Sequence, residues 1–455
     1  MYAEALPWME PAEVATRLHD LPGFVWLDSA GADHPSGRYS YFAIEPISRF
    51  RWPQVESSED FDTAFRSWKS QFRAKPLKGG SPFQGGVIGY VSYDAASIWI
   101  HDFQSRHQPA SNAVIEFALY DTVVAVDHAT RSMTVYSAGL GGAGAAPDEI
   151  LARGQMRRVA KLVCGETGAE VRRGGTEPAW SRAPRQPAYA ELVNTVREEI
   201  LDGEIYQANI ASLWARSGPG HPFADYLRLR QRTEAALSAF GVFEGRILSS
   251  LSPERLVAMD ADGHVRAEPI KGTTRRSPDP GRDRQLAEAL AASEKDRAEN
   301  IMIVDLLRND LSRVCRPESV EVTRLCGVES LPNLHHLVST IAAQLSLGRD
   351  AVDLLGAVFP GGSVTGAPKL RAMEIIDALE PSARGAFCGS FGYIGFDGAC
   401  DFNIMIRTVD HLPDEERYWS GAGITLLSEA NAEWEEVQLK AERILGREPT
   451  PQVPG

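Results

Sequence analysis

Residues 246–274, RILSSLSPERLVAMDADGHVRAEPIKGTT, carry the pattern that decides the fold. Short apolar and β-branched runs flank DADGH at 260–264, which supplies the Asp and Gly of a tight turn, so the stretch predicts successive β-strands. The following stretch at 281–314, GRDRQLAEALAASEKDRAENIMIVDLLRNDLSRV, has apolar residues at helical spacing and predicts one long helix. Strands followed by helices, without a regular β–α–β alternation, predict an α+β fold.

The remaining sequence divides into two parts around a polar segment. Residues 1–135 mix short β-rich runs with a few helical patterns. The stretch from residue 165 to residue 189 contains Gly, Pro and charged residues without an apolar period, which is typical of a linker. We therefore predict an N-terminal region at 1–164, a linker at 165–187 and a C-terminal domain at 188–448.

Composition excludes several classes of protein. The net charge is -14, and nucleic-acid-binding domains usually carry a clustered basic excess, so no nucleic-acid partner is expected. The N-terminal residues show no basic start followed by an apolar run, and no stretch approaches the ~18 apolar residues of a membrane span. We expect a cytosolic, cytoplasmic protein without a membrane partner. The five cysteines form no CxxC pair, so neither a disulfide framework nor structural zinc is predicted.

Two helices carry carboxylates on one face. Asp296 and Glu299 lie three residues apart, as do Glu433 and Glu436, and Lys440 follows Glu436 by four. Both pairs could be solvated helix surfaces. They could also supply oxygen ligands to a hard cation such as Mg²⁺, because each pair borders an apolar run.

Two glycine-rich loops favour an anionic ligand. FPGGSVTGAPKLRAMEIIDAL at 359–379 leads into a helix that we expect to begin at Pro368, and loop amides at a helix start bind anions. The loop lacks the Lys-Ser or Lys-Thr of a phosphate loop, so a nucleotide is disfavoured. GAGIT at 421–425 is either a second such loop or a structural turn. Arg407 ends an apolar strand, where it could bind a carboxylate or lie at the surface.

Eight motifs occur in an order that resembles one enzyme family. They are GEIYQANIA, SLSPER, PIKGT, DRAENIMIVDLLRND, HHLVST, FPGGSVTGAPK, IRT and GAGIT with EWEEVQLKA. Together they are similar to the chorismate-utilising enzymes, strongly over 189–446 and more weakly in the N-terminal third. This family includes anthranilate, aminodeoxychorismate, isochorismate and salicylate synthases. The resemblance implies two large packed antiparallel β-sheets with helices outside and a chorismate-binding catalytic domain at 188–448.

Two positions distinguish the branches of the family. The resemblance implies that water-adding members carry a lysine base where Gln207 stands, and an amide cannot remove a proton from water at neutral pH. Anthranilate synthases carry PIAGT where this chain has PIKGT. At Lys271 the chain therefore resembles the aminodeoxychorismate synthases, which make a precursor of p-aminobenzoate and folate. Anthranilate synthase stays the alternative. GAGIT departs from the GGGIV of many relatives.

The resemblance also implies roles for individual residues. Mg²⁺ would be held by Glu299 and Glu436, with Asp296 and Glu433 supporting metal-bound water. The residues expected at the substrate are Gln207, Thr365, Arg407, Gly421, Gly423 and Lys440. His336 would lie near the reacting ring. The N-terminal segment carries tryptophan inhibition in anthranilate synthases, and LDSAG at 27–31 only partly resembles their motif.

The expected reaction replaces the 4-hydroxyl of chorismate with an amine, a transaminase-type transfer. The Lys271 amine would add at ring C2 as the nucleophile, Glu254 would protonate the leaving hydroxyl, and ammonia would then add at C4. The addition needs an uncharged amine, and neutralising an ordinary lysine at pH 7 costs about 4.6 kcal/mol. No glutaminase motif such as GxCxG occurs, so a glutamine amidotransferase partner is expected to supply the ammonia.

Overall fold

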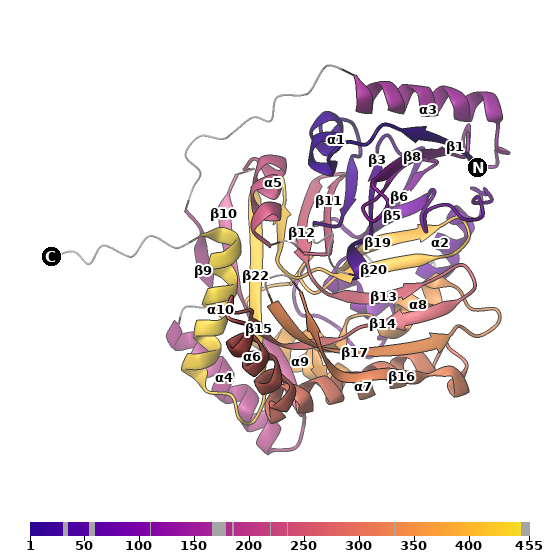
Figure 1. Ribbon diagram of the computed structural model, residues 1–455. Helices are drawn as coiled ribbons and strands as arrows, with labels where there is room; N and C mark the ends of the chain where they lie inside the picture. Colours follow the sequence, from indigo (N-terminus) through magenta and orange to yellow (C-terminus); the bar gives the residue numbers. More distant parts are fainter. Residues whose placement is uncertain are drawn as a thin grey trace.

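The computed structural model describes residues 1–30, 35–53, 60–109, 111–165, 179–183, 186–218, 220–233, 235–331 and 334–446. Two large antiparallel sheets pack face to face, with helices on their outer faces (Figure 1). The predicted α+β fold with two packed antiparallel sheets and outer helices is therefore confirmed. Within the described ranges, no helix combines the length and apolar character needed to cross a membrane.

The first sheet has twelve strands in the described residues. In spatial order they are β1 (Tyr2–Leu6), β8 (Ser132–Ser137), β7 (Thr122–Asp127), β3 (Tyr39–Ala43), β2 (Val25–Asp28), β11 (Leu237–Phe243), β12 (Arg246–Ser252), β21 (Thr408–His411), β22 (Glu415–Ile424), β10 (Gln207–Ser217) and β18 (Gly366–Ala367), with β9 (Ser181–Ala183) paired to β10.

The second sheet has ten strands over the same described ranges. Their order is β15 (Ile270–Arg275), β17 (Leu334–Gln344), β14 (His264–Ala267), β13 (Arg255–Met259), β20 (Cys400–Ile404), β19 (Ser390–Gly395), β5 (Gly86–Val91), β6 (Ala113–Tyr120) and β4 (Ser48–Pro53), with β16 (Glu321–Ser330) paired to β17. β19 and β20 form an antiparallel hairpin.

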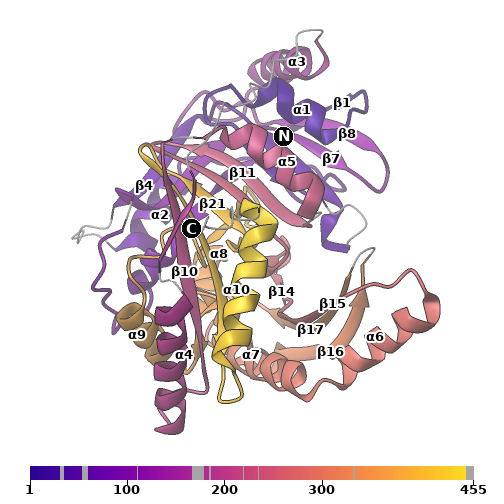
Figure 2. The same cartoon turned by 90° about the vertical axis from the view of Figure 1, so that its left-hand side faces the viewer.

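Helices cover both outer faces, and α10 lies along β22 in both views (Figures 1 and 2). The helices are α1 (Pro11–Leu18), α2 (Phe61–Lys69), α3 (Glu149–Cys164), α4 (Gln186–Leu201), α5 (Pro222–Thr233), α6 (Pro280–Ala292), α7 (Glu294–Ser312), α8 (Ala351–Val358), α9 (Lys369–Leu379) and α10 (Ala430–Leu445).

Strand alternation explains the layered core. Val25 packs between the two sheets, whereas its neighbour Trp26 faces the helices, because successive side chains of a strand point to opposite faces. Ile88 and Val87 divide in the same way on the second sheet. Each sheet is therefore buried on both faces, and the order of layers is helices, sheet, sheet, helices.

Both sheets combine strands from either side of the predicted linker. In the first sheet β2 pairs with β11, and in the second β5 pairs with β19. The predicted linker at 165–187 therefore does not separate two independent sheets. Strands that precede it in the sequence hydrogen-bond to strands that follow it. Within that linker, β9 pairs with β10, and residues 166–178 and 184–185 lie outside the described part.

The long helix predicted over 281–314 is wrong, because the structure contains two helices there. α6 ends at Ala292, and Ser293 has an extended backbone that begins α7. The Ser293 hydroxyl accepts a hydrogen bond from the backbone N–H of Asp296 at 3.3 Å, the typical contact of a helix N-cap. Helix α7 therefore starts two residues before Asp296, the first of the predicted metal-site carboxylates. The helix expected from Pro368 starts one residue later, at Lys369.

Candidate active site

A cavity of about 500 Å³ gathers most of the predicted site residues. Its wall is built from the ends of β10, β15 and β22, from α7 and α10, and from the loops around residues 363 and 406. Ten of the thirteen predicted residues line it: Glu254, Lys271, Asp296, Glu299, Arg407, Gly421, Gly423, Glu433, Glu436 and Lys440. Segments separated by up to 186 residues in sequence, from Glu254 to Lys440, thus share one chamber.

A β-bulge in β15 sets the position of Lys271. The register with β17 shifts between Lys271 and Thr273, so the extra residue, Gly272, redirects the strand. Gly272 has φ +76°, and a Cβ there would lie 2.9 Å from Asp296 Cγ, so only glycine fits the strand so closely against α7. The Lys271 Nζ donates a hydrogen bond to the backbone oxygen of Ser363 at 3.0 Å.

Glu254 is buried between two strands of different sheets. It lies between the end of β12 and the start of β13, and its side chain lines the cavity with only 7% of the residue exposed. The Glu254 backbone N–H donates to Ser252 Oγ at 3.2 Å, and its carbonyl accepts from the Ile404 N–H at 3.0 Å. Burial raises the pKa of Glu254, and the nearby positive charge of Lys271 partly opposes this rise. A buried carboxyl of this kind stays protonated to higher pH than a solvated glutamate.

The carboxylates of α7 and α10 face each other across the cavity mouth. Lys295 Nζ lies 3.7 Å from Glu433 Oε1 and thereby bridges the two helices. Burial raises the pKa of Glu299, and the neighbouring carboxylates Asp296 and Glu436 add to the rise. Burial would also raise the pKa of Glu436, but the combined positive charges of Lys440, with Nζ 2.7 Å from Glu436 Oε1, and of Lys295 and Lys271 outweigh it, so the pKa is lowered. Sequence alone could not show that these helices meet.

This oxygen-only donor set fits a hard divalent cation. The four carboxylates carry negative charge into a partly buried wall, and two lysine side chains currently neutralise part of it. The oxygens of these four carboxylates lie too far apart to form a closed metal cage. Among the described residues, the group with three ligand atoms within 4.8 Å of one another is Asp260, Asp262 and His264, not this one. Mg²⁺ suits such a site, because it takes one or two carboxylates and completes its shell with water or substrate oxygens.

The inner face of β22 lines the opposite part of the cavity. Trp419, Gly421 and Gly423 alternate along this strand and therefore share one face. A Cβ at Gly423 would lie 2.3 Å from Gln207 Nε2, so any larger residue at this point of the β22–β10 pair would have to displace the Gln207 side chain. Lys440 Nζ donates to the Gly421 carbonyl at 2.9 Å.

Arg407, which is half-buried, brings a positive charge to the same chamber. Its backbone has φ +51°, and its carbonyl accepts from the Leu251 N–H at 3.1 Å. Burial lowers the pKa of Arg407, although it stays far above neutrality. The guanidinium forms no hydrogen bond or ion pair with another side chain in the described part of the protein, so it can bind an anion from solution.

Three predicted residues lie outside the cavity wall, and their roles stay predictions. His336 is buried on β17, with Nδ1 2.7 Å from the hydroxyl of Thr273, a residue that lines the cavity. Thr365 is also buried, and its hydroxyl donates to the Gly361 carbonyl at 2.9 Å. Gln207 packs under Gly423 at the start of β10.

Several lining residues were missed by sequence reasoning. Signals for two of them were present, since Lys295 precedes Asp296 and Arg443 follows Lys440 by three residues on α10. Asn209 and Trp419 gave no local signal, yet the buried Oδ1 of Asn209 and the buried Nε1 of Trp419 have no hydrogen-bond partner in the structure. Unpartnered buried polar atoms at a cavity indicate groups that bind a ligand or water.

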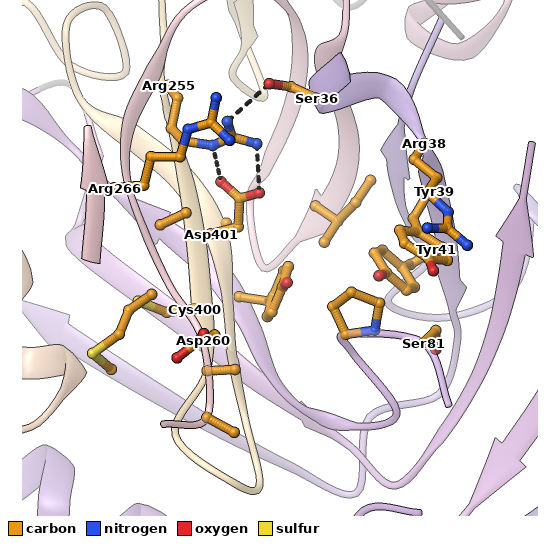
Figure 3. A pocket seen from close by; sticks show the side chains of 18 of the residues that line it. Ser36, Arg38, Tyr39, Tyr41, Ser81, Arg255, Asp260, Arg266, Cys400 and Asp401 are labelled. Carbon is orange, nitrogen blue, oxygen red and sulfur yellow. Dashed lines mark hydrogen bonds and ion pairs between the residues drawn. The ribbon is translucent and has the colours of Figure 1, made fainter. Parts of the chain in front are cut away.

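A second, larger cavity of about 1530 Å³ lies away from these residues (Figure 3). Two of its charged groups, Arg255 and Asp401, are paired with each other: Arg255 donates to both oxygens of Asp401, at 2.8 and 3.0 Å, and to Ser36 Oγ at 2.8 Å. Arg38 lies over the ring of Tyr39, 4.9 Å from its centroid. None of the thirteen predicted site residues lines it.

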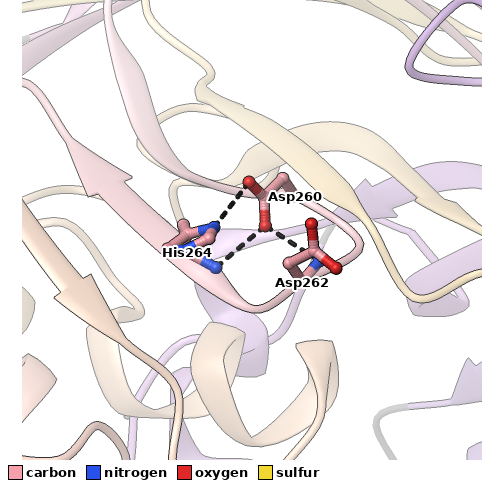
Figure 4. A group of neighbouring side chains, drawn as sticks. All are labelled: Asp260, Asp262 and His264. Atoms are coloured by element: carbon pink, nitrogen blue, oxygen red, sulfur yellow. Dashed lines mark hydrogen bonds and ion pairs between the residues drawn. The ribbon is translucent and has the colours of Figure 1, made fainter. Parts of the chain in front are cut away.

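Asp260, Asp262 and His264 bring three possible metal ligands together at an exposed turn (Figure 4). Hydrogen bonds within the turn account for this cluster. Asp260 Oδ1 accepts from the backbone N–H groups of Asp262 and His264, each at 2.9 Å, and Asp260 Oδ2 lies 2.9 Å from His264 Nδ1. The cluster closes the predicted DADGH turn between β13 and β14.

Comparison with known proteins agrees with this geometry. The model of the chorismate binding enzyme family matches residues 23–446. The chain is 36% identical to aminodeoxychorismate synthase component 1 of Escherichia coli K12 over 446 residues, covering 94% of each chain. It is 35% identical to anthranilate synthase component 1 of Streptomyces coelicolor, covering 94% of this chain and 83% of the relative.

The fold also matches a solved structure. Anthranilate synthase component I from Streptococcus pneumoniae superposes with a TM-score of 0.79 at 26% identity, covering 90% of this chain and 92% of that one. The match of the family model crosses the predicted linker and includes most of the N-terminal region. The chain therefore belongs to the chorismate binding enzyme family.

Proposed function

We propose that this protein converts chorismate and ammonia into 4-amino-4-deoxychorismate. The observation that carries the proposal is the position of Lys271, whose amine lies at the cavity wall beside the buried Glu254. Anthranilate formation does not require this lysine in the proposed scheme. Overall identity does not separate the two activities, since relatives named for each are 36% and 35% identical to the chain.

In the first half of the proposed mechanism, Lys271 acts as the nucleophile. Its uncharged amine forms a bond to C2 of the chorismate ring, both ring double bonds move one position, to C1–C6 and C4–C5, and the C4–O bond breaks. Glu254 gives its proton to the departing hydroxyl, which leaves as water. Burial favours this role, because the raised pKa of Glu254 keeps the carboxyl protonated further towards neutral pH.

In the second half, ammonia replaces the lysine. A new C4–N bond forms, both double bonds return to C1–C2 and C5–C6, and the C2–N bond to Lys271 breaks. The Glu254 carboxylate, now deprotonated, takes up the proton released by the attacking ammonia. The net change is chorismate and ammonia to aminodeoxychorismate and water, a transaminase-type transfer that leaves the enzyme unchanged.

We infer that Mg²⁺ is the cofactor. Glu299 and Glu436 would hold the ion, while Asp296 and Glu433 would orient its bound water. When bound, Mg²⁺ neutralises the ring carboxylate of the substrate and fixes the ring position. The charge of the four carboxylates supports this assignment, because an empty cluster of this kind would repel the chorismate dianion.

Other groups would bind the remaining substrate oxygens. Arg407, Lys440 and the backbone at Gly421 and Gly423 supply donors along one side of the cavity. Thr365 and Gln207 support this wall from behind, the first through its loop and the second under Gly423. His336 would act near the ring through its contact with Thr273.

Ammonia would come from a separate glutamine amidotransferase subunit. The relatives are named component 1, which is consistent with a second component. None of the five cysteines of this chain lines the cavity, so the cavity itself offers no thiol nucleophile for glutamine hydrolysis. The product would enter p-aminobenzoate and folate synthesis.

Product analysis tests the proposal. The purified protein is incubated with chorismate, Mg²⁺ and a high concentration of ammonium, and the products are separated by mass. Aminodeoxychorismate as the main product supports the proposal. Anthranilate with pyruvate as the main product would instead assign the protein to the anthranilate branch.

A further inference from the structure

Trp419 occupies a defined place on the cavity wall. It lies on the inner face of β22, opposite Leu213 of β10, and only 2% of the residue is exposed. Its indole stacks on Phe387 with ring centroids 6.0 Å apart and an interplanar angle of 8°. The stack and the strand fix the orientation of the ring, so the indole N–H cannot turn away to another acceptor.

The N–H group of this indole is buried without a hydrogen-bond acceptor. A buried donor normally has a hydrogen-bond partner, because burial removes its bonds to water and an unpaired donor gains nothing in return. Its ring lines the cavity, so a bound molecule can supply the missing acceptor. The indole nitrogen can only donate, which restricts that acceptor to an oxygen or a similar group.

Arg407 provides a second donor in the same cavity. It lies in the bend just before β21, next to Ile406, and both Arg407 and Trp419 line the cavity wall. Arg407 is half-buried, and the loss of hydration at its guanidinium lowers its pKa, as expected for a cation that forms no ion pair with another described residue. One carboxylate between the two side chains would satisfy both.

We propose that Trp419 is a substrate-binding residue whose indole N–H, together with Arg407, holds the side-chain carboxylate of the substrate. This inference rests on the proposed function, in which Mg²⁺ held by Glu299 and Glu436 binds the ring carboxylate. Chorismate has two carboxylates, and the wall formed by Trp419 and Arg407 receives the one on the enolpyruvyl ether. Trp419 thereby selects ligands that carry this second carboxylate.

Trp419→Phe removes the N–H while the aromatic stack on Phe387 is retained. Trp26→Phe is the matched control, because Trp26 is fully buried, its Nε1 also lacks a partner, and it faces the helices away from both cavities. Binding is measured by calorimetry in the presence of Mg²⁺ with two probes. Meta-carboxyvinyloxybenzoate carries both carboxylates, whereas meta-methoxybenzoate carries only the ring carboxylate.

The expected result is a difference between the probes. Trp419→Phe weakens binding of the dicarboxylate by roughly ten-fold, the usual effect of losing one charge-assisted hydrogen bond, and leaves the monocarboxylate within about two-fold. Trp26→Phe changes neither by more than about two-fold. The KM for chorismate rises in parallel with the dicarboxylate Kd.

Equal binding of the dicarboxylate by wild type and Trp419→Phe would overturn the proposal, as would an equal loss for both probes. If Trp419→Phe unfolds, benzothienylalanine at position 419 removes the N–H with almost no change of shape and gives the same test. Failure of the proposed function is distinguishable, because wild type would then make no aminodeoxychorismate although the binding comparison stays measurable.

Discussion

The side-chain nitrogen of Lys271 lies 3.0 Å from the backbone oxygen of Ser363, which belongs to the glycine-rich loop before α9. This hydrogen bond joins the proposed nucleophile to a loop 92 residues further along the chain. The acceptor is a neutral carbonyl, so it orients the amine without forming an ion pair. The bulge at Gly272 and this bond together hold the amine at the cavity wall.

Lys271→Met should abolish the covalent adduct between enzyme and chorismate, because methionine keeps the length of the side chain but has no amine. We expect the rate of amination to fall on the order of 10³-fold or more. Intact-protein mass spectrometry after rapid quenching measures the adduct. Lys161→Met, on the exposed side of α3, is the control. An adduct that persists in Lys271→Met would remove the nucleophile assignment.

Glu254→Gln should slow formation of the adduct by roughly 10²–10⁴-fold, since the amide cannot protonate the leaving hydroxyl. Burial raises the pKa of Glu254. The acid form needed for this step is therefore present below that raised pKa and is lost as the pH rises through it. Rapid-quench rates measured against pH should show this decline in wild type. A decline of the same shape in Glu254→Gln would assign it to another group.

Glu299→Gln and Glu436→Gln should each weaken Mg²⁺ binding by at least about ten-fold, because each removes a charged oxygen ligand. Calorimetric titration with Mg²⁺ alone measures this without turnover. Asp305→Asn is the matched control on α7, since the Asp305 side chain is 82% exposed. Unchanged affinity in both glutamine variants would place the ion elsewhere.

Asp94 should make stability depend on pH. Burial raises its pKa to about 6 from 3.8, so the folded protein binds this proton more tightly than the unfolded chain. The stabilisation is complete below about pH 4 and is lost as the pH rises through 6. A shift of this size corresponds to about 3 kcal/mol.

Asp94→Asn removes this titration. In urea unfolding, its stability relative to wild type should therefore rise by about 3 kcal/mol between about pH 4 and about pH 8. Asp305→Asn should show no comparable change relative to wild type. A constant difference between Asp94→Asn and wild type across this range would show that the buried carboxyl does not titrate there.

Local patterns predicted the elements well where one period dominated. The strands predicted on either side of the DADGH turn are present as β13 and β14, which pair across it. The prediction of one helix over 281–314 was wrong because the apolar period continues across residue 293. The helix itself is interrupted there, where Ser293 caps the start of α7. SEKD contains the N-cap signal, with Asp296 three residues after the serine.

The site could be predicted only as far as motifs identify residue types. That α7 and α10 bring their carboxylates to one cavity depends on the packing of two sheets, which no local pattern contains. Trp419 was missed for the same reason, since its unpartnered N–H exists only once β22 and Phe387 are packed around it. His336 lies behind Thr273 because the bulge at Gly272 shifts the register of β15 against β17.

The most direct test of the central claim compares wild type and Lys271→Ala with chorismate, Mg²⁺ and ammonium, with products resolved by mass. We predict that wild type forms 4-amino-4-deoxychorismate through a detectable lysine adduct, and that Lys271→Ala forms neither. Abundant anthranilate from wild type, without aminodeoxychorismate, would contradict the account.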